Sequence, residues 1–378
     1  MNKIRYFDYA ATTPVDERVL QKMLPYFKNE FGNPSSVYDL GKANKDVINY
    51  ARLQVARAIN CSPEEIYFTS CGSESDKLAI KGIAKANRGN HIITSKIEHP
   101  AVLETCRALE KEGFEVTYLN VDKYGVVNVK ELEKSIRKDT ILISIMYANN
   151  EIGTIEPIEE IGKIAKMRNI IFHTDSVQAI GNIKIDVKKL NIDSLSMSAH
   201  KFYGPKGMGA LYVRGGVRFQ RQQDGGHQEK EKRSGTENVP GIVGIGEAIE
   251  IAEEELKEHS GKLKYLRDLY IKAISSRIQG IYINGSLENR LPGNSNISFL
   301  GIQGSKMVEL LNKKGICVSS GSACSAGLIK PSQVILNTGA SIQIADSALR
   351  VTFGKYNTIE DLKYLVDAIE EIVKKYRR

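Results

Sequence analysis

The sequence predicts an α/β protein with a large domain, in which helices flank a mainly parallel sheet, and a smaller α+β domain. Three observations lead to this prediction. Apolar runs typical of strands alternate with helical runs over residues 65–214, which is the pattern of a parallel sheet with helices on both faces. A polar, glycine-rich loop at 215–238 precedes a long helical stretch at 240–277, which we expect to connect the two domains. The rest of the chain mixes short strands with helices, as α+β domains do.

Each element follows from a local pattern. Residues 14–31 read as a short helix after a proline. The Asn-Pro and Ser-Ser pairs that follow start a long amphipathic helix through Val47, Tyr50, Ala51 and Val55. The expected strands of the large sheet are EIYFTS, HIITSK, EVTYLN, TILISIMYA, IIFHTD, SLSMSA and GALYVR, which begin at residues 65, 91, 115, 140, 170, 194 and 209. The helical stretches between them lie near 74–87, 99–112, 129–137 and 158–168.

The chain divides into three parts. Residues 1–15 are expected to form an N-terminal arm that joins the small domain, residues 16–255 the large domain, and residues 256–378 the small domain. In the small domain, strands are expected near 281–283, 294–300 and 349–353, and helices near 304–314 and 358–376.

Composition excludes several classes of protein. No stretch of the 378 residues approaches the roughly 20 apolar residues of a membrane span, and the N-terminus lacks the apolar core of a signal peptide. The five cysteines, with no C-x-x-C pair, argue against a disulfide framework or a zinc ribbon and suit a reducing compartment. We therefore expect a cytoplasmic protein without a bound metal. Cys71 and Cys317 are expected to be buried.

The net charge of +8 is spread along the chain. It is compatible with an acidic protein or RNA partner, or simply with a solvated basic surface. No RNA-binding motif is visible, so direct nucleic-acid binding is not expected.

A lysine and an aspartate at the ends of two expected strands indicate a cofactor site. Lys201 follows SLSMSA in a loop rich in glycine and proline, and Asp175 ends IIFHTD. A lysine among small residues at a strand end is either a solvated turn residue or the nucleophile that forms a Schiff base with an aldehyde cofactor. An acidic residue nearby could keep the ring nitrogen of pyridoxal phosphate protonated. Parallel sheets bind ligands at this edge, which favours the second interpretation.

The motifs around these residues resemble those of the cysteine desulfurase family, which uses pyridoxal phosphate. D-S-V-Q-A followed by S-A-H-K-F-Y-G-P-K-G carries the resemblance, with further matches from YFDYAATTP near the start to LRVTFGKYNT near the end. The resemblance covers nearly the whole chain. It implies the fold of the class-V aminotransferase-like enzymes (fold type I), a homodimer, and a Schiff base between Lys201 and the cofactor.

The resemblance also implies which other residues bind the cofactor. A strand that ends in a small-residue turn before a helix is either an ordinary helix start or an anion site; the family binds the cofactor phosphate at such a turn, here Gly72 and Ser73. His99 is either structural or an imidazole stacked on the pyridine ring that also moves protons. The remaining residues implied for the ring and the phosphate are Asn150, Asp175, Gln178, Ser198 and His200, with Thr236 reaching the phosphate from the second subunit. Cys71 and Lys77 stand where the family has other residues.

Two further residues define the expected reaction. Cys324 lies among serines, glycines and alanines, a composition that favours a mobile loop. A free cysteine is often a buried structural residue, but SGSAC-S followed by K-P-S resembles the persulfide-carrying loop of the desulfurases. Arg350 is either a strand residue at the surface or, as in the family, the two-point ligand of a substrate carboxylate, with Asn33 assisting from the other side.

The sequence therefore predicts a cysteine desulfurase that converts L-cysteine to L-alanine and leaves a persulfide on Cys324. We expect a sulfur-acceptor protein as partner, such as an iron–sulfur scaffold or a tRNA-thiolation enzyme. Two alternatives remain open at this point: a selenocysteine lyase or aminotransferase on the same scaffold, and a sulfur-relay or tRNA-binding platform.

Overall fold

The computed structural model describes residues 4–321 and 331–377. Its largest sheet has seven strands in the order β2-β8-β7-β6-β5-β3-β4. Only β8 among them runs antiparallel to its neighbours, β2 and β7. The strands are β2 Ile66–Thr69, β3 His91–Ser95, β4 Glu115–Leu119, β5 Thr140–Ser144, β6 Ile171–Asp175, β7 Ser194–Ser198 and β8 Gly209–Val213. The prediction of a mainly parallel sheet built from these seven segments is confirmed.

Helices cover both faces of this sheet because neighbouring strand residues point to opposite sides. Ile93 packs in one core with residues of α3, α7 and α9, whereas its neighbour Ile92 packs in another core with α4 and α5. Both side chains are fully buried, and each such side chain stabilises the fold by about 1.5–3 kcal/mol. The helices are α3 Asp39–Ile59, α4 Gly72–Ala86, α5 Pro100–Lys111, α6 Val129–Lys134, α7 Ile158–Arg168 and α9 Val239–Arg277.

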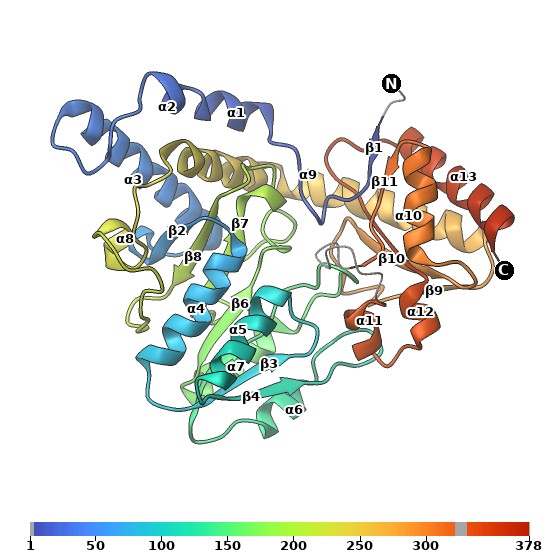
Figure 1. Cartoon of the computed structure of the whole chain (residues 1–378), viewed down its shortest axis with the longest axis horizontal. Coiled ribbons are helices and arrows are strands. Elements are labelled where there is room, and N and C mark those ends of the chain that lie inside the picture. Colours follow the sequence, from blue (N-terminus) through green and yellow to red (C-terminus); the bar gives the residue numbers. More distant parts are fainter. Residues whose placement is uncertain (1–3, 322–330, 378) are drawn as a thin grey trace.

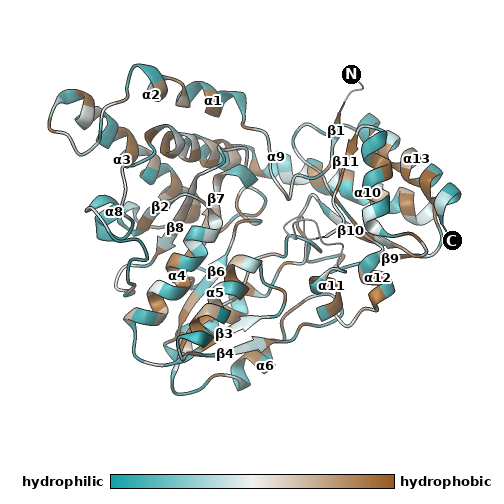
Figure 2. Cartoon of the chain, viewed as in Figure 1, coloured by the Kyte–Doolittle hydropathy of each residue, from teal (hydrophilic) through white to brown (hydrophobic). Residues whose placement is uncertain are grey.

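The small domain is a three-stranded antiparallel sheet covered by helices. The strand order is β12-β10-β9, and the helices α10 and α13 pack with this sheet in a separate core. In Figure 2, α10 and α13 show alternating brown and teal segments, as amphipathic helices do. The elements are β9 Ile281–Ile283, β10 Asn294–Phe299, α10 Gly304–Lys313, α11 Gln333–Asn337, α12 Ile342–Asp346, β12 Ala348–Thr352 and α13 Ile359–Tyr376.

Two segments join the domains. Helix α9 runs without interruption for 39 residues from one domain into the other (Figure 1). Its first half contributes Ile245 to a core of the large domain, and its second half contributes Tyr270 to the core of the small domain. The N-terminal arm enters the small domain, where β1 (Arg5–Tyr6) pairs in parallel with β11 (Ile316–Cys317). A long helix in this part of the chain was expected from the sequence.

Other expectations need correction or extension. The expected helix at 14–31 is two short helices, α1 (Glu17–Met23) and α2 (Pro25–Lys28). The loop at 215–238 contains one short helical segment, α8 (Gln228–Glu231). The strand β1 and the helices α11 and α12 were not predicted. The expectation that Cys71 and Cys317 are buried is wrong, because both are only half-buried. No helix among the described residues is both long and apolar enough to cross a membrane.

Candidate active site

The two residues that the sequence singled out lie on neighbouring strands at one edge of the large sheet. Asp175 is the last residue of β6, and Lys201 follows β7 in a short 3₁₀ turn. The strands pair in parallel, with Asp175 opposite Ser196. Both residues therefore lie at the carboxyl edge of the sheet, where α/β proteins bind ligands.

The N-terminal arm closes one side of this edge. Lys201 Nζ donates to the backbone carbonyls of Ala10 at 2.7 Å and Ala11 at 2.6 Å. Gln178, three residues after Asp175, donates from Nε2 to the same Ala10 carbonyl at 3.0 Å. The arm thus holds the lysine amine and the Gln178 amide at one point.

The charge of Lys201 affects the pKa values of both His99 and Asp175. Burial raises the pKa of Asp175, and the attraction of His99 and Lys201 opposes that shift. Burial lowers the pKa of His99, Lys201 lowers it further, and Asp175 raises it. His99 is also the N-cap of α5, where its Nδ1 accepts a hydrogen bond from Ala101 N at 3.1 Å. Because Nδ1 accepts, a neutral His99 carries its proton on Nε2.

The start of α4 offers free backbone donors beside these residues. Gly72 and Ser73 are the first two residues of the helix, and no side chain caps it. Among the described residues, no hydrogen bond uses the N–H of either one. A Cβ at Gly72 would lie 2.7 Å from Val177 Cγ2 and 3.5 Å from Ser198 Cβ, so glycine is needed for this close approach. The turn has the properties of an anion site.

His200 is held by the arm as well. Its Nδ1 lies 3.0 Å from Thr12 Oγ1, and its carbonyl accepts from Thr13 Oγ1 at 3.1 Å. Burial, together with Lys201 and Lys206, lowers the pKa of His200 to about 4. His200 is therefore neutral at physiological pH, so it can serve an anion only as a hydrogen-bond donor.

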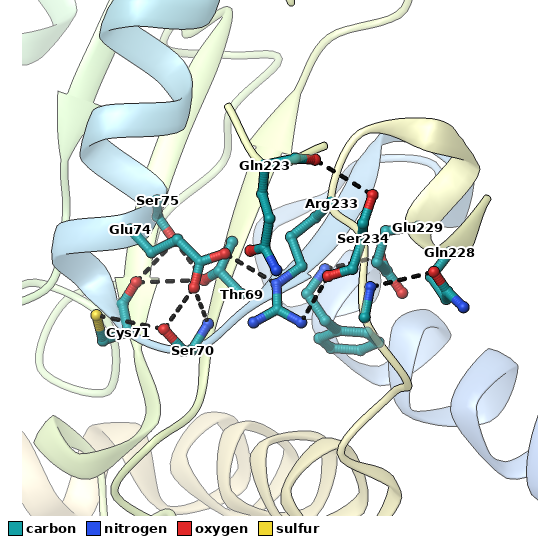
Figure 3. Close-up of polar contacts among 12 residues, drawn as sticks. Thr69, Ser70, Cys71, Glu74, Ser75, Gln223, Gln228, Glu229, Arg233 and Ser234 are labelled. Carbon is teal, nitrogen blue, oxygen red and sulfur yellow. Dashed lines mark hydrogen bonds and ion pairs between the residues drawn. The ribbon is translucent and has the colours of Figure 1, made fainter. Parts of the chain in front are cut away.

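Glu74 draws the first turn of α4 toward another loop (Figure 3). Its Oε2 accepts from Ser70 N at 2.7 Å and from the Ser70 hydroxyl. Its Oε1 accepts from Arg233 Nε at 2.9 Å. Burial raises the pKa of Glu74, but the hydrogen bonds from Arg233 and Ser70 outweigh this and leave the pKa lowered. Glu74 is thus a carboxylate, and the guanidinium of Arg233 neutralises its charge.

Arg350 lies in β12 with its guanidinium buried. Nη2 donates to Asp8 Oδ1 at 2.7 Å, and Nη1 donates to the carbonyl of Asn150 at 3.1 Å. Nε is buried and has no hydrogen-bond partner among the described residues. A buried N–H without a partner is costly, and a carboxylate ligand would satisfy it in the planar fork that arginine offers.

Cys324 lies outside the described residues, but the segments on either side of it are anchored beside Arg350. Ser319 and Arg350 form a two-bond backbone bridge, with N–O distances of 3.2 and 2.6 Å. Ser332 Oγ donates to Glu151 Oε2 at 2.5 Å, and Glu151 follows Asn150 in the chain.

Asn33 and Thr236 lie apart from this cluster. Both are exposed and line one surface hollow of about 410 Å³, together with Tyr26, Phe31 and Asn44. None of the residues around Lys201 lines that hollow. Within the single chain, neither Asn33 nor Thr236 lines a hollow together with Lys201, and their expected roles stay predictions.

Sequence reasoning missed several residues of the site. Asp8 and the carbonyls of Ala10 and Ala11 belong to the arm, whose YFDYAATTP motif was noted only as a match. Glu74 and Arg233 were not singled out either. Glu74 could have been recognised from the sequence, because it is an acidic residue at the third position of a helix.

These residues fit pyridoxal phosphate. The cofactor needs an amine for its aldehyde, a carboxylate for its ring nitrogen and an anion site for its phosphate. Lys201, Asp175 and the turn at Gly72 supply these groups at one sheet edge. The unpaired Nε of Arg350 adds a place for a substrate carboxylate. The fold and the site thus define a pyridoxal-phosphate enzyme that acts on an amino acid.

Comparisons with known proteins narrow this class. The family model for class-V aminotransferases matches residues 5–365. The chain is 54% identical to the cysteine desulfurase IscS of Methanosarcina thermophila and 52% identical to that of Clostridium botulinum. Each match covers 100% of this chain, and 93% and 96% of the respective relative. A solved NifS-like protein superposes with a TM-score of 0.93 at 42% identity, covering 99% of this chain and 100% of its own. The chain belongs to the cysteine desulfurase family.

Proposed function

We propose that this protein is a cysteine desulfurase that releases alanine from L-cysteine and takes the sulfur onto Cys324. The observation that carries this proposal is the placement of Lys201, Asp175 and His99 at one sheet edge, with the buried Arg350 beside the anchored flanks of the Cys324 segment. Family membership supports the same conclusion.

The cofactor, when bound, supplies an electron sink that allows bonds at the substrate carbons to break. Asp175 would hold a proton on the ring nitrogen, and a cationic nitrogen there would favour the carboxylate form of this buried acid. Arg350 would bind the substrate carboxylate through its free N–H groups. Lys201 and the neutral His99 are the two bases that would move protons to and from the substrate carbons.

The sulfur step belongs to Cys324. Its thiolate would attack the sulfur of the substrate, so that the carbon–sulfur bond breaks as the sulfur–sulfur bond forms. A proton delivered to the carbon then leaves alanine, and the persulfide stays on the protein. A second protein would take this sulfur; an iron–sulfur scaffold or a tRNA-thiolation enzyme has the required chemistry.

A homodimer would complete the site. Five large apolar side chains are exposed on α1, α2 and the segment before α3, and single copies rarely expose such a surface without use. The hollow that contains Thr236 lies beside them. A second copy seated on this surface would cover it and allow Thr236 to reach the other phosphate site. Light scattering measures the molar mass and so tests whether two copies associate. The exposed residues are Leu20, Leu24, Phe27, Phe31 and Val37.

Cytoplasmic location is also a proposal. Its support is that Cys61, Cys71, Cys106 and Cys317 are all free thiols, as is usual in a reducing compartment.

The test is turnover by the isolated protein, followed by mass analysis of its peptides. Incubation with L-cysteine should give alanine and one added sulfur on the peptide that contains Cys324. A selenocysteine lyase would act on selenocysteine and leave cysteine unchanged. An aminotransferase would give a keto acid, and a sulfur-relay platform would give no alanine. Any of these outcomes would refute the proposal.

A further inference from the structure

Arg233 contacts the first turn of α4 from a loop far away in the sequence. The arginine and Glu74 are each about one-quarter exposed, with side-chain exposures of 23% and 24%. Glu74 directly follows Ser73, so it lies in the same first turn of α4 as the free N–H groups of Gly72 and Ser73. A carboxylate at the third position of a helix normally stabilises the helix start, and here it also lies beside the anion site.

Glu74 would weaken the binding of an anion at this turn unless its negative charge were neutralised. A free carboxylate there would repel a phosphate dianion, because like charges at close range destabilise each other. It could also turn toward the N–H groups of Gly72 and Ser73 and occupy them. In the structure, both carboxylate oxygens are engaged elsewhere, by Ser70 on one side and Arg233 on the other.

Arg233 does not hold its loop in place by itself. Glu229, in the same loop, receives a two-point contact from the buried Arg52, with N–O distances of 2.8 and 2.7 Å, and accepts from Phe68 N at 2.8 Å. Ser234 Oγ donates to the carbonyl of Gly226 at 3.0 Å. The Glu229 contacts anchor the loop to α3 and β2, and the Ser234 bond holds the loop together internally, so replacing Arg233 should leave the loop attached.

We infer that Arg233 is a positioning residue for the cofactor phosphate: it neutralises Glu74 and holds that carboxylate away from the phosphate turn. The inference rests on the proposed phosphate site at Gly72 and Ser73. Arg233 acts through Glu74 and makes no direct contact with the cofactor in this proposal.

The test compares two probes, pyridoxal phosphate and pyridoxal, on cofactor-free protein. Lys201 can react with the aldehyde of either probe, but only the first carries the phosphate. Arg233→Ala should raise the dissociation constant for pyridoxal phosphate about tenfold. The constant for pyridoxal should stay within about threefold, because no phosphate is present to be repelled. Both constants are measured by equilibrium dialysis.

Removing the uncompensated charge should restore binding. The double variant Arg233→Ala/Glu74→Gln should bind pyridoxal phosphate within about threefold of the wild type, and Arg233→Lys should do the same because it keeps the charge. Arg221→Ala is the matched control, since the Arg221 side chain pairs with Asp224 in the same loop rather than with Glu74. It should change neither constant.

Three results would overturn the inference. The first is an equal loss of affinity for both probes in Arg233→Ala. The second is a double variant that binds pyridoxal phosphate as weakly as Arg233→Ala does. The third is an unchanged dissociation constant for pyridoxal phosphate in Arg233→Ala. If Arg233→Ala does not fold, Arg233→Gln keeps most of the side chain without its charge and carries the same expectations. A wild-type protein that binds neither probe would instead refute the proposed function, so the two failures are distinguishable.

Discussion

Replacing Arg350 with alanine should impair substrate binding far more than cofactor binding. The guanidinium is 3% exposed and is the buried partner of Asp8. A charge-assisted contact with the substrate carboxylate is worth about 1.5–3 kcal/mol, which corresponds to a rise in KM from roughly tenfold to 150-fold. The variant also leaves the Asp8 carboxylate without its cation, facing the incoming substrate carboxylate. We therefore expect the upper end of this range.

Steady-state kinetics with L-cysteine measures the KM, and equilibrium dialysis checks that pyridoxal phosphate still binds. The double variant Arg350→Ala/Asp8→Asn should recover part of the loss, because the unpaired acid is removed. A KM for Arg350→Ala that equals the wild-type value would show that the substrate carboxylate is held elsewhere. A double variant no better than Arg350→Ala would show that Asp8 does not repel the substrate.

Three other variants test the remaining roles. Lys201→Ala should lose both turnover and the visible absorbance of the lysine-bound cofactor; an undiminished band would remove Lys201 from its role. Asp175→Asn should retain the cofactor but slow turnover by at least about 100-fold, since a neutral amide no longer favours a protonated ring nitrogen; kcat measures this, and an unchanged value would contradict it. Cys324→Ser should keep the fold and the cofactor spectrum but stop alanine production, because a hydroxyl is a far weaker nucleophile toward sulfur. Wild-type alanine release by that variant, or added sulfur on Cys71, would assign the nucleophile elsewhere.

The sequence was sufficient for much of the fold because strand-like runs alternate regularly with helical runs along the large domain. IIFHTD and SLSMSA could be recognised as strands of a mainly parallel sheet, and their carboxyl ends then had to lie at one edge. β1 could not be recognised, since two residues carry no periodicity. It exists because the arm pairs with β11, after α10, across more than 300 positions in the chain.

The part of the site that was missed depends on contacts that no local pattern records. Lys201 binds the carbonyls of Ala10 and Ala11, and a backbone acceptor leaves no mark on side-chain composition. Glu74 and Arg233 are 159 positions apart. Cys71 was expected to be buried as a small residue among others, but it stands at a helix N-cap, where an extended residue is left partly exposed.

The long helix α9 has a consequence for how the protein unfolds. At 1.5 Å per residue, its 39 residues extend about 58 Å. Ile245 and Tyr270, on the same helix, are each fully buried in the core of a different domain. Melting either core would expose that part of the helix to water and remove the support on which the other part depends. We therefore expect the two cores to unfold as one cooperative unit, in a single transition on heating or in denaturant.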